Sequence, residues 1–200
     1  MEGFQKINLL DFIDEIGEEK AKSFLEIFSC PYNADVEDFF KNKAITFARQ
    51  RLSSVWIVFA SYKGEWCLCG YFALAQKHFH IDLKALKSNL RGRIRKFATY
   101  DKEINKYLLV APLIGQLGKN FFSGYDKLIT GDELLKIACD TVKQAQRILG
   151  GRIVYLEAED VPALINFYER NGFYKFGQRS IDSDEKLKGK NLIQFLKYLN

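Results

Sequence analysis

Six side chains of the sequence could act as nucleophiles or soft metal ligands: Cys30, Cys67, Cys69, Cys139, His78 and His80. Cys67 and Cys69 are two residues apart in strand-like sequence, so their side chains lie on one face of the strand. A structural zinc site needs four closely spaced ligands, and a nucleophilic cysteine needs a neighbouring base. Neither pattern is present. The sequence therefore predicts reduced, buried cysteines, no metal and no covalent cysteine intermediate.

Two segments carry glycines near polar residues that could meet an anion. Residues 115–120, GQLGKN, are not a Walker loop, because the glycine spacing is wrong and Asn120 replaces the required Ser or Thr. Residues 130–133, TGDE, form a capping box that starts a helix. Asp132 and Glu133 put two carboxylates in its first turn, where they oppose the binding of a second anion.

The composition is that of an ordinary globular protein. The chain has 200 residues, of which 48% are hydrophobic, 28% charged and 14% aromatic, with only 3 prolines. This excludes disordered and proline-rich proteins. No apolar run approaches the roughly 20 residues that span a bilayer, and no secretory signal begins the sequence. We expect one domain over residues 1–200, with residues 1–28 as an N-terminal helical extension, located in the cytoplasm and not in a membrane.

The net charge is +5, but the charges are unevenly distributed. Residues 11–26 contain six acids and two lysines, whereas residues 84–106 contain eight Lys or Arg residues and two acids. The basic stretch suits RNA, a phosphate-bearing cofactor, or simply a solvated helix face.

Hydrophobic periodicity and turn residues give the expected elements. We expect helices at 9–28 with a break at Gly17, 33–51 with Asn33 as N-cap, 82–97, 131–149 and 162–171. We expect strands at 55–62, 66–80, 107–120, 152–159, 173–180 and 191–199, with a charged loop between the last two. The strand–helix–strand unit at 107–157 implies a parallel pair, and the flanking hairpins imply antiparallel ones. The fold class is α/β (α+β): a mixed, mostly antiparallel central sheet of about six or seven strands with helices on both faces.

The most specific string is NFYERNGF, residues 166–173, which follows a buried strand ending in acids and leads through Gly-Phe into another strand. In this context the chain resembles the GNAT superfamily of acetyl-CoA-dependent N-acetyltransferases, over roughly residues 28–199. The resemblance implies the GNAT fold, acetyl-CoA as co-substrate, and transfer of its acetyl group to a primary amine by direct attack.

The resemblance also implies roles for individual residues. Tyr168 would be the general acid that protonates the departing thiolate, as a phenolic hydroxyl can. Asn166 and Arg170 would contact the pantetheine arm or the phosphates. Glu157, at the end of its strand, is a candidate for accepting the proton of the amine; a helix-capping or solvated acid is the alternative.

Two segments would hold the co-substrate through their backbones. The N–H groups of Leu117, Gly118 and Lys119 would bind the acetyl carbonyl and the pantetheine amide. The pyrophosphate loop would be residues 127–132, that is Lys127, Leu128, Ile129, Thr130, Gly131 and Asp132. This loop has one glycine where the family has two or three, so the cradle departs from the family pattern.

Three further interpretations stay open. The segment CPYNADVEDFFKNKA, residues 30–44, is similar to GNAT toxins that acetylate aminoacyl-tRNA, so tRNA is an alternative acceptor. The acidic first turn at residues 132–133 is compatible with a catalytically degenerate binding module. The basic stretch is compatible with a nucleic-acid-binding protein. Residues 1–28 could cover the core, shape the acceptor cleft or contact a second copy in a homodimer.

Overall fold

The computed structural model describes residues 3–181 and 191–200. In these ranges eight strands are hydrogen-bonded in the order β1-β2-β3-β5-β6-β8-β7, and β4 pairs with β5. The chain divides into two compact units. The first contains residues 1–75 and 115–138, and the second contains residues 76–114 and 139–200. Each unit has its own apolar core.

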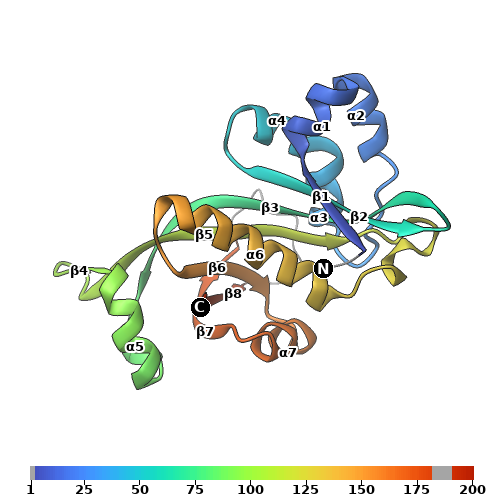
Figure 1. Cartoon of the computed structure of the whole chain (residues 1–200). Helices are drawn as coiled ribbons and strands as arrows, with labels where there is room; N and C mark the ends of the chain where they lie inside the picture. Colours follow the sequence, from blue (N-terminus) through green and yellow to red (C-terminus); the bar gives the residue numbers. More distant parts are fainter. Residues whose placement is uncertain (1–2, 182–190) are drawn as a thin grey trace. The chain divides into compact units, whose positions relative to one another are not determined.

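The first unit begins with three antiparallel strands and the helices that connect them (Figure 1). The strands are β1 (Phe4–Asn8), β2 (Ser54–Tyr62) and β3 (Glu65–Ile81), and β1 pairs with β2 from Phe4↔Ala60 to Asn8↔Trp56. The helices between β1 and β2 are α1 (Leu9–Ile16), α2 (Glu18–Leu25), α3 (Ala34–Asp38), the π-helical turn η1 (Phe39–Lys43) and α4 (Ala44–Arg49).

Local sequence explains where these elements begin and end. Gly17 separates α1 from α2 because its φ of 86° is a left-handed conformation that glycine adopts without strain. Asn33 caps α3, since its Oδ1 accepts hydrogen bonds from the N–H groups of Asp35 at 3.0 Å and Val36 at 3.1 Å. Lys63 and Gly64, with φ of 52° and 85°, make the tight turn between β2 and β3.

Helices cover both faces of β3 in the first unit. A Cβ built on Gly70 would lie 3.1 Å from Leu134 of α6 (Gly131–Leu149), so this face of the strand lies directly against that helix. The next residue, Tyr71, points to the opposite face, where its ring stacks on Phe40 of η1 at a centroid distance of 4.2 Å. The Tyr71 hydroxyl donates to the Val36 carbonyl at 2.6 Å, which satisfies this buried polar group.

Asn120 is the polar centre of the first unit, and its side chain is fully buried. Its Oδ1 accepts from the N–H groups of Ser29 at 2.9 Å and Phe122 at 3.1 Å, and its Nδ2 donates to the Leu68 carbonyl at 3.0 Å. Its own N–H donates to the Cys69 carbonyl at 2.9 Å. One amide therefore joins the segment after α2, strand β3 and the chain that follows β5 (Lys106–Lys119).

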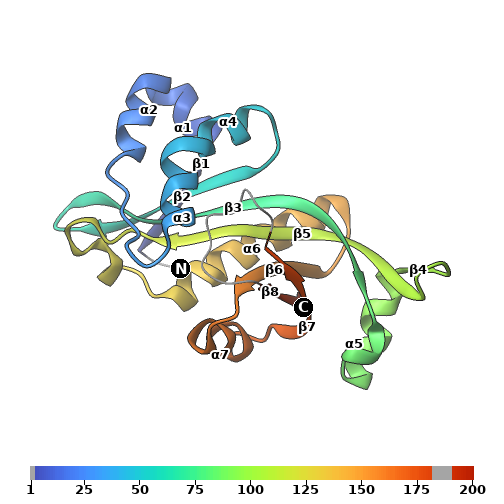
Figure 2. The same ribbon diagram turned by 180° about the vertical axis from the view of Figure 1, so that it is seen from behind.

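The second unit contains the strands and helices between β3 and β5 and those that follow α6 (Figure 2). Its further strands are β4 (Thr99–Asp101), β6 (Ile153–Glu159), β7 (Tyr174–Ser180) and β8 (Asn191–Tyr198), and its helices include η2 (Leu83–Ala85), α5 (Ser88–Ile94), η3 (Arg95–Phe97) and α7 (Pro162–Arg170). β5 and β6 are parallel through Leu113↔Tyr155 and Ile114↔Leu156, and β6–β8 and β7–β8 are antiparallel. Leu90 and Ile94 bury α5 against Phe79 and Leu109 of the strands.

These observations confirm the mixed, mostly antiparallel sheet and the parallel pair that the sequence predicts. The expected number of strands was too small, because β1 and β4 are short and polar and lack a strand-like pattern. Residues 1–28 are consequently not all helical. The helix expected at 82–97 is interrupted, since Leu86 and Lys87 are extended with ψ near 150°. The charged loop expected after 180 falls on residues 182–190, outside the described residues.

The helices were also compared with the length and hydropathy of a membrane-spanning helix. Among residues 3–181 and 191–200, no helix is long and apolar enough to cross a membrane. The longest of these helices, α6, has charged side chains throughout its 19 residues.

Replacing Asn120 should strongly destabilise the protein. Asn120→Ala leaves two partly buried N–H groups and one buried carbonyl without this partner, and we expect a loss of about 3 kcal/mol in the free energy of unfolding. Urea unfolding followed by circular dichroism measures this. Asn42→Ala, which removes an exposed amide, is the control and should change stability by less than about 0.5 kcal/mol. Equal effects of the two variants would contradict a central role for Asn120.

Candidate functional site

The end of β5, where a backbone site is predicted, belongs to the first unit and packs tightly against α3. A Cβ on Gly118 would lie 2.4 Å from the Val36 side chain and 3.2 Å from Phe28, so only glycine fits there. The Gln116 amide donates to the Asp35 carboxylate at 2.9 Å. These contacts fix the strand segment that contains Leu117, Gly118 and Lys119 against the start of α3.

The side chain of Lys119 is engaged by the loop that follows the strand. Its Nζ donates to the carbonyls of Asp126 at 2.7 Å and Ile129 at 3.2 Å. It thereby closes the turn η4 (Phe122–Lys127) onto the end of β5. Through these two hydrogen bonds the Lys119 ammonium positions the loop.

The N-terminus of α6 carries the predicted capping box. The Thr130 N–H and hydroxyl donate to the Glu133 carboxylate at 2.8 and 2.7 Å, and the Glu133 N–H donates back to the Thr130 hydroxyl at 3.2 Å. The hydrogen bond from the Thr130 backbone, followed by that from its hydroxyl, lowers the pKa of Glu133. A charged carboxylate therefore already occupies donors that a diphosphate would need.

The other residues of the predicted pyrophosphate loop differ in exposure. Ile129 is buried at 2% and Leu128 is half-buried, so both contribute packing. Lys127 is exposed, and it is the one positively charged side chain among residues 127–132. With Asp132 and Glu133 in the first turn, this segment accommodates a diphosphate only when the Glu133 carboxylate turns away from Thr130.

Tyr168 belongs to the second unit, on α7. Its ring packs on Phe195 at a centroid distance of 5.5 Å and on Phe173 at 5.9 Å. Burial raises the pKa of its hydroxyl to about 12, from an ordinary value at which tyrosine is already protonated at neutral pH. Within the described part of the chain, the hydroxyl makes no hydrogen bond. A protonated phenol without a partner can donate a proton or a hydrogen bond to a ligand.

The string after Tyr168 holds α7 in place. Gly172 has a φ of 79° and ends the helix, and the Phe173 N–H donates to the Tyr168 carbonyl at 3.0 Å. Lys197 donates to the Asn171 carbonyl at 2.7 Å, which ties the helix end to β8. The sequence RNGF is thus a helix stop that fixes the orientation of Tyr168.

Asn166 and Arg170 lie on the same helix but not beside Tyr168. Both are exposed, whereas Tyr168 is half-buried. Residues two apart on a helix point about 200° away from each other, so neither side chain shares the face of Tyr168. Arg170 lies over the Phe167 ring at 5.2 Å. Their contact with a co-substrate stays a prediction.

Glu157 is the centre of a polar cluster that the sequence analysis did not find. Its carboxylate accepts hydrogen bonds from the Tyr155 hydroxyl, from Arg179 at 2.8 and 2.7 Å, and from the Gln194 amide at 3.3 Å. Tyr155 and Glu157 are two apart in a strand, which predicts a common face. Arg179 and Gln194 come from β7 and β8, and only the strand pairing reveals them.

These donors make Glu157 a weak base. Burial alone would raise its pKa, but the hydrogen bonds from Arg179 and Tyr155 outweigh that effect, and the pKa lies below its ordinary value of 4.5. Burial and the Glu157 charge raise the pKa of Tyr155. The arrangement favours a structural ion pair over a proton acceptor, and the role of Glu157 as a base stays a prediction that this geometry does not support.

The cysteines and histidines do not gather into a site. All four cysteines are buried, and burial raises the pKa of Cys69 to about 12 and raises that of Cys30. Such thiols are poor nucleophiles at neutral pH. In the ranges that the structure describes, no group of three or more His, Cys, Asp or Glu side chains could hold a metal ion.

Comparisons with known proteins give similarity at the level of structure. A scan against protein-family models finds no match, and a search of curated proteins finds none. The structure of AtaT complexed with acetyl-methionyl-tRNAfMet has a TM-score of 0.60 and 17% identity, covering 95% of this chain and 93% of that one. A Tyr-to-Phe mutant of KacT has a TM-score of 0.60 and 14% identity, covering 96% of this chain and 94% of that one. The NatC complex bound to Gag peptide and CoA has a TM-score of 0.52 and 15% identity, covering 99% of each chain.

These similar structures are GNAT acetyltransferases, so the fold predicted from the sequence is confirmed. This chain has the GNAT fold. The features that led to the prediction, the parallel β5–β6 pair and the helix α7 that ends at Asn171-Gly172, are present as expected.

The ion pair at Glu157 makes stability depend on pH. Arg179→Met leaves a buried carboxylate unpaired, and we expect the free energy of unfolding to fall by about 3 kcal/mol at pH 7. A lowered pKa in the folded state contributes stability above pH 4.5, and this contribution is lost as the pH falls through the lowered value. The difference between wild type and variant should therefore shrink towards about pH 3.

Urea unfolding at several pH values measures this difference, with Lys175→Met on the same strand as the control. A difference that stays constant with pH would show that Arg179 contributes packing rather than charge.

Proposed function

We propose that the chain is an acetyl-CoA-dependent N-acetyltransferase that acts on a primary amine. The observation that carries this proposal is Tyr168, a protonated and half-buried hydroxyl without a partner in the described residues, on the α7 helix of a GNAT fold. The neighbours AtaTR and NatC have been solved with acetyl-CoA and with CoA, which supports the same co-substrate here.

The proposed reaction is a direct attack of the amine on the acetyl carbonyl. A tetrahedral intermediate forms, and its oxyanion accepts hydrogen bonds from backbone N–H groups at Leu117, Gly118 and Lys119. The carbon–sulfur bond then breaks, and the Tyr168 hydroxyl protonates the departing thiolate. The proton of the amine passes to solvent, because Glu157 is held by its ion pair with Arg179, and solvent then returns a proton to Tyr168.

The pyrophosphate of acetyl-CoA is assigned to residues 127–132 at the start of α6. The N–H groups of the first turn and the exposed Lys127 are its donors. Glu133 competes with it for Thr130. The capping box thus sets how tightly this chain holds acetyl-CoA. If Glu133 prevented acetyl-CoA from binding, the chain would be a binding module without catalytic activity.

A second candidate acceptor is the α-amine of an aminoacyl-tRNA. The basic stretch 84–106 includes α5 and η3, where Arg91, Arg95 and Lys96 are exposed. Such a surface attracts the phosphates of RNA. AtaT, which has a similar fold, has been solved in complex with acetyl-methionyl-tRNAfMet. Small-molecule and protein amines are the other class of acceptor to be tested.

Acetyl-CoA should stabilise the folded protein. At a concentration about 100 times its Kd, mass action adds roughly 2.7 kcal/mol, which raises the melting temperature by about 5 to 10 °C. Thr130→Arg should abolish this increase, because a bulky side chain at the start of α6 blocks the phosphates. Glu133→Gln should enlarge it, since Gln keeps the capping geometry but removes one negative charge.

Thermal melts of the three proteins, each with and without acetyl-CoA, test these expectations. A wild type that shows no increase would contradict the enzyme proposal. An increase that both variants leave unchanged would place the phosphates elsewhere.

Tyr168→Phe should reduce catalysis without destabilising the fold. Loss of the proton donor should lower kcat by about 100-fold and leave KM for acetyl-CoA nearly unchanged. Release of free thiol from acetyl-CoA in the presence of candidate amines and charged tRNA measures both constants. Tyr174→Phe on β7 is the matched control and should retain full activity. Full activity of Tyr168→Phe would remove the general acid from the mechanism.

A further inference from the structure

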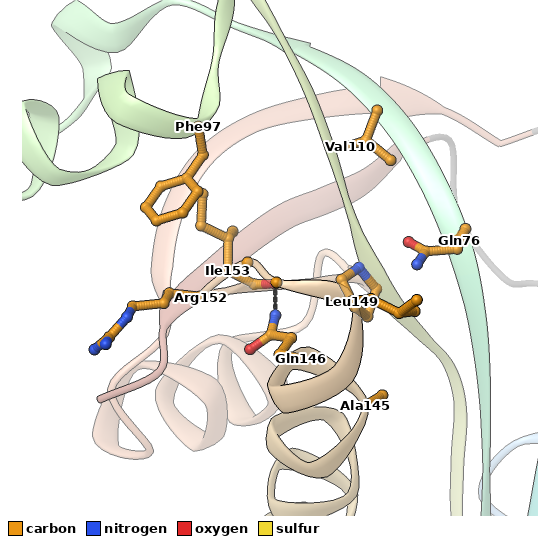
Figure 3. A pocket seen from close by; sticks show the side chains of 11 residues that line it. Gln76, Phe97, Val110, Ala145, Gln146, Leu149, Arg152 and Ile153 are labelled. Atoms are coloured by element: carbon orange, nitrogen blue, oxygen red, sulfur yellow. Dashed lines mark hydrogen bonds between the residues drawn. The ribbon is translucent and has the colours of Figure 1, made fainter.

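The second unit contains a hollow that the proposed chemistry does not use (Figure 3). Its volume is about 250 Å³, and it lies between the last turn of α6, the loop to β6, strands β3 and β5, and η3. Leu149 and Gln146 come from α6, Val110 and Pro112 from β5, Phe97 from η3 and Arg152 from the loop. We name this feature the α6-end hollow.

Large apolar side chains gather at the α6-end hollow although water reaches them. Leu149 is 74% exposed, Val110 65% and Phe97 38%, and the adjacent Ile148 is 85% exposed. Apolar side chains that are exposed singly are normal, but a group around one depression marks an interaction site.

The wall of the hollow is held in place before any partner arrives. The Gly150 N–H donates to the Gln146 carbonyl at 2.9 Å, and the Gln146 side-chain amide donates to the Ile153 carbonyl at 2.8 Å. Gly150 and Gly151, with φ of 81° and 95°, make the sharp exit from α6. A preformed wall lowers the entropy that binding must overcome.

Two of the segments that line the hollow are basic. Residues 84–97 and 141–153, which supply Phe97 and the α6 side of the lining, contain nine Lys or Arg residues and no acids. Arg95, Lys96, Arg147 and Arg152 are exposed, and in the described residues no carboxylate forms a salt bridge with them. The carbonyls at the end of α6 carry only partial negative charge. The surface therefore favours an acidic partner.

We propose that the α6-end hollow binds an acidic peptide segment of a partner protein. One bulky apolar side chain of the peptide enters the hollow between Leu149, Val110 and Phe97. Its Asp and Glu side chains pair with Arg95, Lys96 and Arg152. This mode, an apolar anchor with a charged rim, is common to peptide-binding grooves.

Two other occupants fit the observations less well. A second copy of the chain would bring this basic surface against itself in a symmetric pair, and like charges repel. RNA would be attracted by the cations and can stack a base on Phe97, but the other large lining side chains, Leu149 and Val110, are aliphatic and offer no stacking surface. The apolar lining is thus what distinguishes a peptide from RNA.

A selection from a random peptide display library on the immobilised full-length protein tests the proposal. Enriched peptides should combine Asp or Glu with Leu, Ile, Phe or Trp. The most enriched peptide, made synthetically with a fluorescent label, is then titrated by polarisation against the wild type. Leu149→Ala and Arg152→Glu should each weaken binding by about tenfold or more. Leu52→Ala and Lys20→Glu, exposed positions of the first unit, are the matched controls and should bind as the wild type does.

Other outcomes would overturn the proposal. The proposal is wrong if the selection enriches no acidic peptides. It is also wrong if the enriched peptides bind Leu149→Ala as tightly as the wild type. A labelled RNA hairpin that binds the wild type, is weakened by Arg152→Glu and is unaffected by Leu149→Ala would assign the surface to nucleic acid. Sedimentation that shows a dimer dissociated by Leu149→Ala would assign it to a second copy. Both substituted side chains are exposed, so the variants should fold, and circular dichroism checks this.

Discussion

The side-chain amide of Asn120 is fully buried, and its hydrogen bonds are made within the chain. Those bonds reach segments that are far apart in sequence: Ser29 after α2, Leu68 and Cys69 in β3, and Phe122 at the start of η4. The strand end at residues 117–119 is therefore held from three directions. The preceding residue, Lys119, donates hydrogen bonds to the carbonyls of Asp126 and Ile129. These bonds fix the loop that leads into the first turn of α6.

In the second unit, the proposed general acid Tyr168 is held in place in a different way. Tyr168 is positioned by a helix stop, because Gly172 ends α7 and returns the chain so that Phe173 packs under the tyrosine ring. The same packing raises the pKa of the hydroxyl above its ordinary value. A local backbone signal thus sets both the orientation and the acidity of the side chain.

Sequence reasoning succeeded where the signal was local. The Thr130–Glu133 capping box, the Asn33 cap and the break at Gly17 each depend on neighbouring residues, and all are present. It failed where the cause lies in pairing between distant segments. β1 and β4 are stabilised by their partner strands, and the partners of Glu157 depend on the register of β7 and β8. The buried side chain of Ile129, in a loop expected to face a ligand, likewise follows from tertiary packing.

The Arg179–Glu157 pair spans the breadth of three strands, because Arg179 on β7 reaches past β8 to Glu157 on β6. β7 is an edge strand, and its register against β8 already shifts between Lys175 and Gly177. A slip of one further residue would turn Arg179 to the opposite face and leave the buried Glu157 carboxylate without its cation. The ion pair therefore helps to specify the register of this edge strand, because a one-residue slip is electrostatically unfavourable.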